Sequence, residues 1–187
     1  MTDIIIKDVR LSFPRLWTAQ EFKAGDGKPR YDASFLIPKG SETDKAIQAA
    51  MLAATTETHG KKAPALLAQW AANPNKCCYT DGDTKEYDGY EGMMALSTHR
   101  PAKQGDPLII DRDKSPLLET DGRPYAGCYV NAKVSIYAQA GDNPGIRASF
   151  SVVQFVRDGD AFAGSGKPTA EEFEELAVTG GEFADLM

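Results

Sequence analysis

Apolar and polar residues alternate most regularly in residues 128–138 of this chain. The even-numbered positions are all apolar, from Cys128 to Ala138, and the odd-numbered ones are polar or aromatic. A period of two over eleven residues predicts a long, half-buried strand. After the glycine-containing loop 141–145, residues 146–157 keep a similar rhythm, so the two segments are expected to form a hairpin. The expected apolar face of the second strand is Ile146, Ala148, Phe150, Val152 and Val156.

The first 40 residues predict another antiparallel pair. Residues 3–17 alternate, and Pro14 is expected to stop that strand because proline has no amide hydrogen to give to a neighbouring strand. Turn-forming residues occupy 24–29, and residues 30–37 then predict a strand that Pro38 ends.

A helical period appears between these strand regions. Residues 42–57 repeat small and apolar side chains at helical spacing, and Ser41 with Asp44 three positions later forms an N-terminal cap pattern. A shorter helix is expected from Pro64 through Trp70. Two stretches outside these helices, residues 90–98 and 108–110, predict a third main strand and a small one.

The order of these elements predicts the fold class. Five or six strands, a long hairpin and an inserted helix pair do not alternate as strand and helix, which favours a mainly β (α+β) domain built on a small, strongly bent barrel. A length of 187 residues fits one domain. The apolar rhythm fades after residue 157, so we expect a domain at 1–160 followed by a flexible linker and tail at 161–187.

Charge separates the tail from the body. The net charge is −6, and residues 170–187 hold six acidic residues and no basic one, which leaves residues 1–169 with 21 of each sign. The tail could serve only solubility. Its acidic residues are, however, interleaved with apolar ones, as in a peptide that docks on a basic, apolar groove of a partner. The candidate partner-binding residues are Glu171, Glu172, Phe173, Glu174, Glu175, Glu182, Phe183 and Asp185.

The polar face of strand 128–138 carries candidate chemistry. Tyr129, Lys133 and Tyr137 place an aromatic, a cation and an aromatic at every fourth position, a pattern suited to stacking nucleic-acid bases and binding phosphates. Each step spans ~13 Å, so neighbouring strands would have to fill the gaps. The alternative is that the two tyrosines pack as amphipathic residues at the edge of the core. The other candidates for the same surface are Arg10, Arg15, Trp17, Arg30, Tyr31, Arg100 and Lys103.

No catalytic constellation, metal site or cofactor site is expected. Asp81, Asp83 and Asp88 could be metal-binding carboxylates of a nuclease, but turn residues that cap their own backbone explain them better. His59 and His99 lack a third ligand at metal spacing. The N-terminus is acidic and no apolar run is long enough to cross a bilayer, which favours a cytoplasmic protein.

Five segments, taken in order, resemble a family of bacteriophage single-stranded DNA-binding proteins. They are Val9–Trp17, Tyr31–Pro38, Asp81–Asp83, Tyr125–Asn131 and Val153–Gly159. The resemblance covers most of residues 5 to 160 and implies an OB-fold that sheathes single-stranded DNA during phage replication or recombination. The tail is similar to acidic C-terminal tails that recruit replication and repair proteins and compete with DNA, although this chain ends on Met187 where such tails often end on phenylalanine.

These observations together predict a non-enzymatic protein of the host-cell cytoplasm. It is expected to bind single strands with little sequence preference, through cations on phosphates and aromatic side chains on bases. The alternative from another class is a protein-interaction module that works through its acidic tail, and a metal nuclease ranks third. The sequence leaves open whether the chain forms a homo-oligomer.

Overall fold

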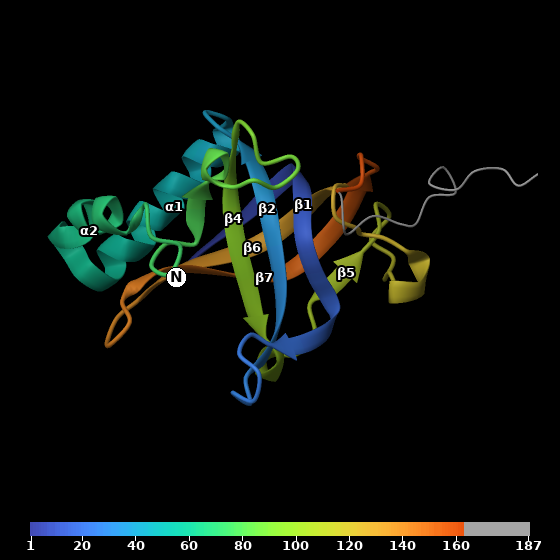
Figure 1. Cartoon of the computed structure of the whole chain (residues 1–187), viewed down its shortest axis with the longest axis horizontal. Coiled ribbons are helices and arrows are strands. Elements are labelled where there is room, and N and C mark those ends of the chain that lie inside the picture. Colours follow the sequence, from blue (N-terminus) through green and yellow to red (C-terminus); the bar gives the residue numbers. More distant parts are fainter. Residues whose placement is uncertain (163–187) are drawn as a thin grey trace, which may run out of the picture.

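A computed structural model describes residues 1–162 of the chain as a curled seven-stranded sheet with two helices at one end (Figure 1). The strand order is β3-β4-β2-β1-β6-β7-β5, and every pairing is antiparallel except β5 with β7. The strands are β1 (Thr2–Glu21), β2 (Pro29–Pro38), β3 (Tyr79–Asp81), β4 (Met93–Pro101), β5 (Leu108–Ile110), β6 (Tyr129–Gln139) and β7 (Gly145–Arg157). The helices are α1 (Glu42–His59) and α2 (Ala63–Trp70).

The expected mainly β class with an inserted helix pair is confirmed. The sheet has seven strands rather than five or six, because β3 is only three residues long and shows no period in the sequence. Strand β4 packs against β7 across the curled sheet, and a single bridge joins Cys77 to Ile146. The hydrogen-bonded ladder still ends at β3 and β5, so the sheet is bent as expected but is not closed into a barrel.

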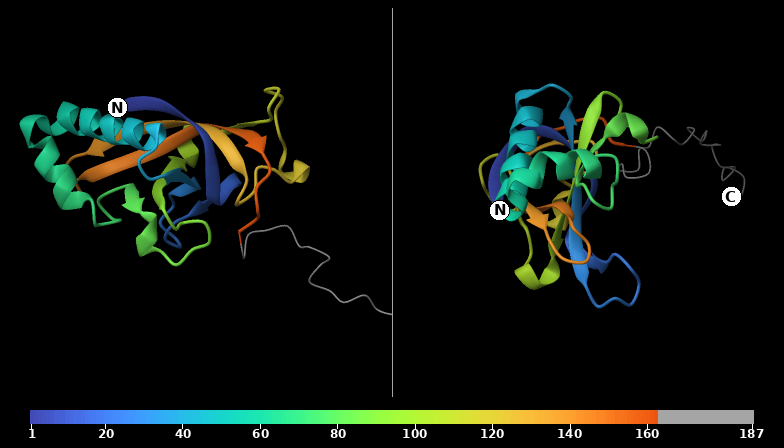
Figure 2. Two further views of the ribbon diagram at one scale, coloured as in Figure 1. Left: turned by 90° about the horizontal axis from the view of Figure 1, so that it is seen from above. Right: turned by 90° about the vertical axis from the view of Figure 1, so that its left-hand side faces the viewer.

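The core lies on the concave face of the sheet and is closed by α1. Alternate residues of β6, from Val130 to Ile136, are buried there, as the period of two predicts. Helix α1 packs on β6 and β1, and its buried side is led by Ile47 and Ala54 (Figure 2). The expected cap is present, since the Ser41 hydroxyl accepts a hydrogen bond from the amide of Asp44 at 3.2 Å.

Pro14 does not end the first strand, which continues to Glu21. The β1–β2 register shifts between Ser12 and Arg15, so Pro14 sits in a bulge that needs no ladder hydrogen bond from it. In the same bulge Phe13 has a φ of +46°, in the left-handed region. The sequence pattern therefore located the strand but missed the irregularity inside it.

A second bulge changes the face of β7. Its register against β6 shifts beside Val134, after which Val153 and Phe155 are buried, while Val152 and Val156 are partly exposed. The expected face was therefore right up to Phe150 and wrong beyond it, because one extra residue reverses the alternation.

The described part of the chain ends at Phe162, so the predicted partner-binding residues between Glu171 and Asp185 lie outside it. None of the helices within residues 1–162 is long and apolar enough to cross a membrane.

Candidate nucleic-acid interface

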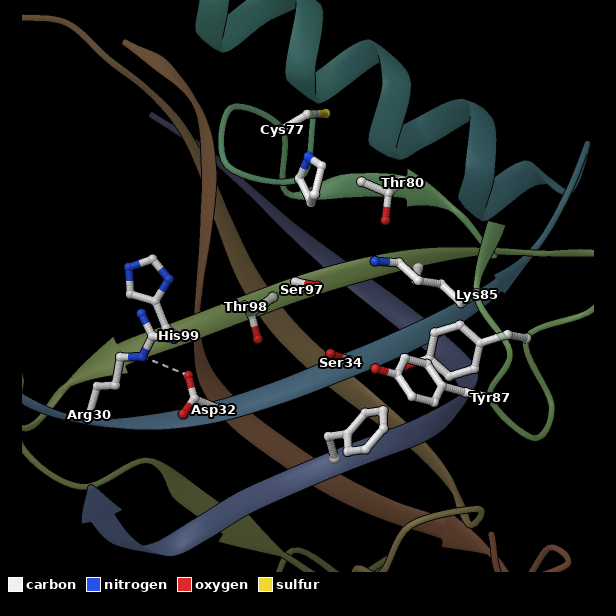
Figure 3. Close-up of a pocket in the computed structure, with 14 residues that line it drawn as sticks. Arg30, Asp32, Ser34, Cys77, Thr80, Lys85, Tyr87, Ser97, Thr98 and His99 are labelled. Atoms are coloured by element: carbon white, nitrogen blue, oxygen red, sulfur yellow. Dashed lines mark ion pairs between the residues drawn. The ribbon is translucent and has the colours of Figure 1, made fainter. Parts of the chain in front are cut away.

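A groove of about 350 Å³ lies on the convex face of β2 and β4, opposite the core (Figure 3). Its floor follows from the strand register. Ser34 pairs with Ser97, and Asp32 pairs with His99, so both pairs share this face. The small serine side chains leave the middle of the floor hollow. One wall comes from the segment around β3, including Cys77, Thr80 and Lys85.

Three aromatic rings form one end of the groove. Phe13 and Tyr87 are 53% and 54% exposed, and their ring centroids lie 4.9 Å apart in an edge-to-face contact. Tyr90 lies beneath them, 5.2 Å from the Tyr87 ring, and its hydroxyl lies 3.1 Å from the Ser12 hydroxyl. Two exposed rings on a buried one form a platform that a planar base can stack on.

Arg30 and Asp32 line the opposite end of the groove, and Arg15 reaches Asp32 from an adjoining hollow. Asp32 pairs with Arg15 at 3.1 Å and with Arg30 at 2.8 Å (Figure 3 marks the second pair). The Arg30 guanidinium also lies 4.3 Å from the centre of the Phe22 ring. Asp32 thus pairs with both arginines, and the three side chains together carry one net positive charge.

His99 is the titratable group of this floor. Burial lowers its pKa, and the nearby Arg30 lowers the pKa further, whereas Asp32 opposes the shift. The imidazole is therefore mostly neutral at pH 7. Its Nε2 lies 3.5 Å from the Tyr137 hydroxyl, which places Tyr137 beside the arginine end of the groove.

Two further hollows adjoin the groove and share lining residues with it. One, of about 540 Å³, shares Arg30 and His99; the other, of about 430 Å³, shares Phe13. The groove and these two hollows are together called the track, which is lined by aromatic and cationic side chains and also by three carboxylates, those of Asp26, Asp32 and Glu119. The first hollow adds Phe22, Lys23, Lys28 and Lys103, and the second adds Arg15, Trp17, Arg123 and Tyr125.

Four of the ten residues predicted for DNA binding line this track: Arg15, Trp17, Arg30 and Lys103. These four residues come together through strand pairing. The end of β1 pairs with the start of β2, and the start of β2 pairs with the end of β4, which the loop containing Lys103 follows.

Three other predicted residues are occupied by structural contacts. Tyr31 is buried on the core side of β2, and its hydroxyl donates to Asp106. Tyr129 is stacked by Arg157, whose guanidinium carbon lies 3.5 Å from the ring centre, and more distantly by Arg10. Arg10 itself donates to the carbonyl oxygens of Gly127 and Asp160.

Arg100 donates to the carbonyl oxygens of Gln104 and Gly105, so it fixes the loop after β4. Lys133 is exposed on β6, 3.8 Å from Asp3, and lines none of the three hollows. The predicted row of Tyr129, Lys133 and Tyr137 therefore does not form one platform in this geometry, because arginine stacks on Tyr129 and Tyr137 turns toward His99.

The acidic turn is held by a lysine. Lys39 pairs with Asp81 at 2.6 Å and with Asp83 at 2.5 Å, and these contacts lower the pKa of both carboxyl groups. Among the residues from 1 to 162, no three His, Cys, Asp or Glu side chains are grouped so that they could hold a metal ion.

A family model for the single-stranded DNA-binding protein of Enterobacter phage Enc34 matches residues 2–183. The chain belongs to this family. A second phage relative, protein p50 of Acyrthosiphon pisum secondary endosymbiont phage 1, is 44% identical over 178 residues, with 94% of each chain covered.

Solved structures support the fold of this member of the Enc34 family. The Enc34 single-stranded DNA-binding protein in complex with single-stranded DNA matches with a TM-score of 0.70 at 21% identity, over 86% of this chain and 89% of that one. Bacteriophage T7 gp2.5, a single-stranded DNA-binding protein, matches with a TM-score of 0.58 at 13% identity, over 94% and 99%.

In this member of the Enc34 family, the aromatic end of the track was missed from the sequence. Phe13 has the same parity as the apolar Val9 and Leu11, so the alternation predicts a core side chain, whereas the bulge leaves its ring exposed. Lys85 and Tyr87 lie in a connection between strands. Their signal is a cation and two aromatics within the six residues before Glu91, in a turn-rich segment that shows no strand or helix period.

Proposed function

We propose that this protein binds single-stranded DNA with little sequence preference along the convex track, with phosphates on its cations and bases on its exposed aromatic rings. The observation that carries the proposal is the pair of half-exposed rings, Phe13 and Tyr87, at the end of a groove with cationic walls. Stacking accepts any base, because each has a π-face. Family membership supports the same ligand class, and binding alone, without catalysis, is proposed.

The charge pattern sets the expected salt dependence. Within residues 1–162, four track lysines form no ion pair: Lys23, Lys28, Lys85 and Lys103. Each phosphate neutralised on a single strand contributes about −0.7 to the slope of log affinity against log salt, so four contacts give about −3.

Titration of fluorescein-labelled oligo-dT by anisotropy over a salt series tests this proposal. The Lys85→Ala variant should reduce the slope by about 0.7, whereas Lys133→Ala, an exposed lysine away from the track, should leave it unchanged. Absence of binding at low salt would refute the proposal. If the Lys133 variant changes the slope and the Lys85 variant does not, the DNA binds on β6 and not along the track. A duplex of equal length should bind more weakly, because its bases are not available for stacking.

We further propose that the acidic tail recruits partner proteins and competes with DNA for the track. Six acids without a basic residue are attracted to the same cations as phosphates. A chain ending at Pro168 should then bind oligo-dT more tightly than the full chain at low salt, and the difference should vanish at high salt. Equal affinity at low salt would reject the competition but not the recruitment.

The tail also carries the rival proposal, a protein-interaction module in which the sheet is only a scaffold. Retention of a partner by the tail alone, together with no DNA binding by residues 1–168, would favour it. For the DNA-binding proposal, the biological setting is phage replication or recombination in the host cytoplasm, as a monomer or a homo-oligomer.

A further inference from the structure

A second, smaller apolar cluster covers one end of the convex face, next to the groove. On that face the row Ser12–Ser34–Ser97 is followed by Leu36 and Ala95, which pair across β2 and β4. Tyr90, Ala126 and Phe162 pack on these two residues. The groove therefore ends where this cluster begins, and Tyr90 belongs to both.

Phe162 is the element of this cluster that comes from the far end of the domain. It is 7% exposed, and its amide donates to the carbonyl oxygen of Ala126 at 3.2 Å. The Arg10 guanidinium lies 4.4 Å from the centre of its ring while donating to the carbonyl oxygens of Gly127 and Asp160. Arg10 thus contacts the ring and also binds the chain at Asp160, two residues before Phe162, and at Gly127, next to the residue that accepts the Phe162 amide.

The Phe162 ring lies directly against the loop that carries Tyr87. A Cβ atom added at Gly89 would lie 2.5 Å from the ring, so the loop backbone rests on its edge, and Gly89 has a φ of +80°. Gly89 is flanked by Tyr87 two positions before and Tyr90 one position after. The ring is therefore a support beneath both tyrosines of the platform.

We infer that Phe162 is a positioning residue for base stacking: clamped by Arg10, it holds the Tyr87–Tyr90 loop so that the Tyr87 ring stands beside Phe13. This inference rests on the proposed function, because it concerns the same groove. Without the ring the loop loses its floor at Gly89. Tyr87 is then held only from within the loop, by the Tyr90 ring and by the hydrogen bond from the Tyr90 amide to the Tyr87 carbonyl oxygen, and by its edge contact with Phe13. Phe162 thus supports the binding surface from beneath without being part of it.

A double-mutant cycle on the full chain tests the inference. Tyr87→Ala should weaken oligo-dT binding about tenfold, in the lower half of the range for one stacked base. Phe162→Ala should cause a similar loss, and the double variant should lose little more than either single variant, since both remove the same stacking contact. Phe162→Leu keeps part of the support and should lose about threefold.

The control is Leu117→Ala, which removes a buried side chain from the main core away from the groove and should keep wild-type affinity. If Phe162→Ala binds oligo-dT like the wild type, the inference is wrong. It is also wrong if the double variant loses affinity by the product of the two single fold-losses, because the two side chains then act independently. If Phe162→Ala does not fold, the same cycle run with Phe162→Leu decides by the same criterion. Failure of the wild type to bind oligo-dT would instead refute the proposed function.

Discussion

We expect the Phe13 side chain to contribute to DNA binding and to add almost nothing to the stability of the fold. It is a half-exposed phenylalanine with a φ of +46°, in a bulge where any residue other than glycine, asparagine or aspartate is strained. Backbone strain of this kind is concentrated at functional sites. We therefore predict that Phe13→Asn leaves stability nearly unchanged and weakens binding of single-stranded DNA.

The magnitudes follow from the contacts of the ring. The left-handed conformation costs a phenylalanine roughly 1–2 kcal/mol, which asparagine largely avoids. Against this, the variant loses an edge-to-face contact with Tyr87 and a longer one with Tyr90, together worth about 1–2 kcal/mol. The two terms nearly cancel, so the free energy of unfolding should stay within about 1 kcal/mol of the wild type. Losing one stacked base should cost about 1–3 kcal/mol of binding.

Two measurements check this prediction. Urea unfolding followed by tryptophan fluorescence gives the stability, and anisotropy with labelled oligo-dT gives the affinity. Phe35→Ala calibrates the stability scale, since Phe35 is fully buried and its truncation should cost about 3–5 kcal/mol. A Phe13→Asn variant that is destabilised as much as Phe35→Ala, or that binds DNA with full affinity, would show that the ring serves the core instead.

Two further predictions concern charge. Asp44 is buried, which would raise its pKa, but hydrogen bonds from Gly40, Gln48 and Tyr79 lower the pKa on balance. Tyr79→Phe should therefore cost about 1.5–3 kcal/mol at pH 7, and the difference should shrink in urea melts as the pH falls below about 4, where Asp44 becomes protonated in the unfolded and then in the folded chain. Asp32→Asn should tighten oligo-dT binding a few-fold at low salt, because it frees the guanidinium charges beside it; unchanged or weaker binding in the salt titration would mean that Asp32 is needed to position them.

The regular elements of this fold could be predicted because burial on one side leaves a periodic signal. The alternation of β6 and the capped helix α1 both agree with the structure. Strand β3 could not be predicted, since three residues are too few to show a period. Register shifts were invisible for a related reason: an extra residue changes which face follows, but it leaves the local composition unchanged.

The candidate site was only partly predictable, because charge and aromaticity mark a side chain without saying what it binds. Arg10 and Tyr129 have the composition of a nucleic-acid contact, yet each is the partner of another residue in the same fold. Arg15 and Arg30 also form ion pairs, but with a carboxylate at the groove floor, which leaves their outer edges accessible. Arg10 and Tyr129 differ from Arg15 and Arg30 in where their contact partners lie. That position depends on long-range strand pairing, which the sequence pattern does not show.

On the convex face, the proposed binding surface and part of the apolar packing both lie beside the row Ser12–Ser34–Ser97. A sheet face with only small serines would be a weak binding surface, since it offers neither charge nor a ring. The bulge at Phe13 raises a ring from one side of this row, and the loop on Phe162 brings a second ring from the other. Both rings depend on irregular backbone that the surrounding apolar contacts hold in place. Substitutions at the supports should therefore reduce DNA affinity before they unfold the domain, whereas substitutions in the concave core should do the reverse.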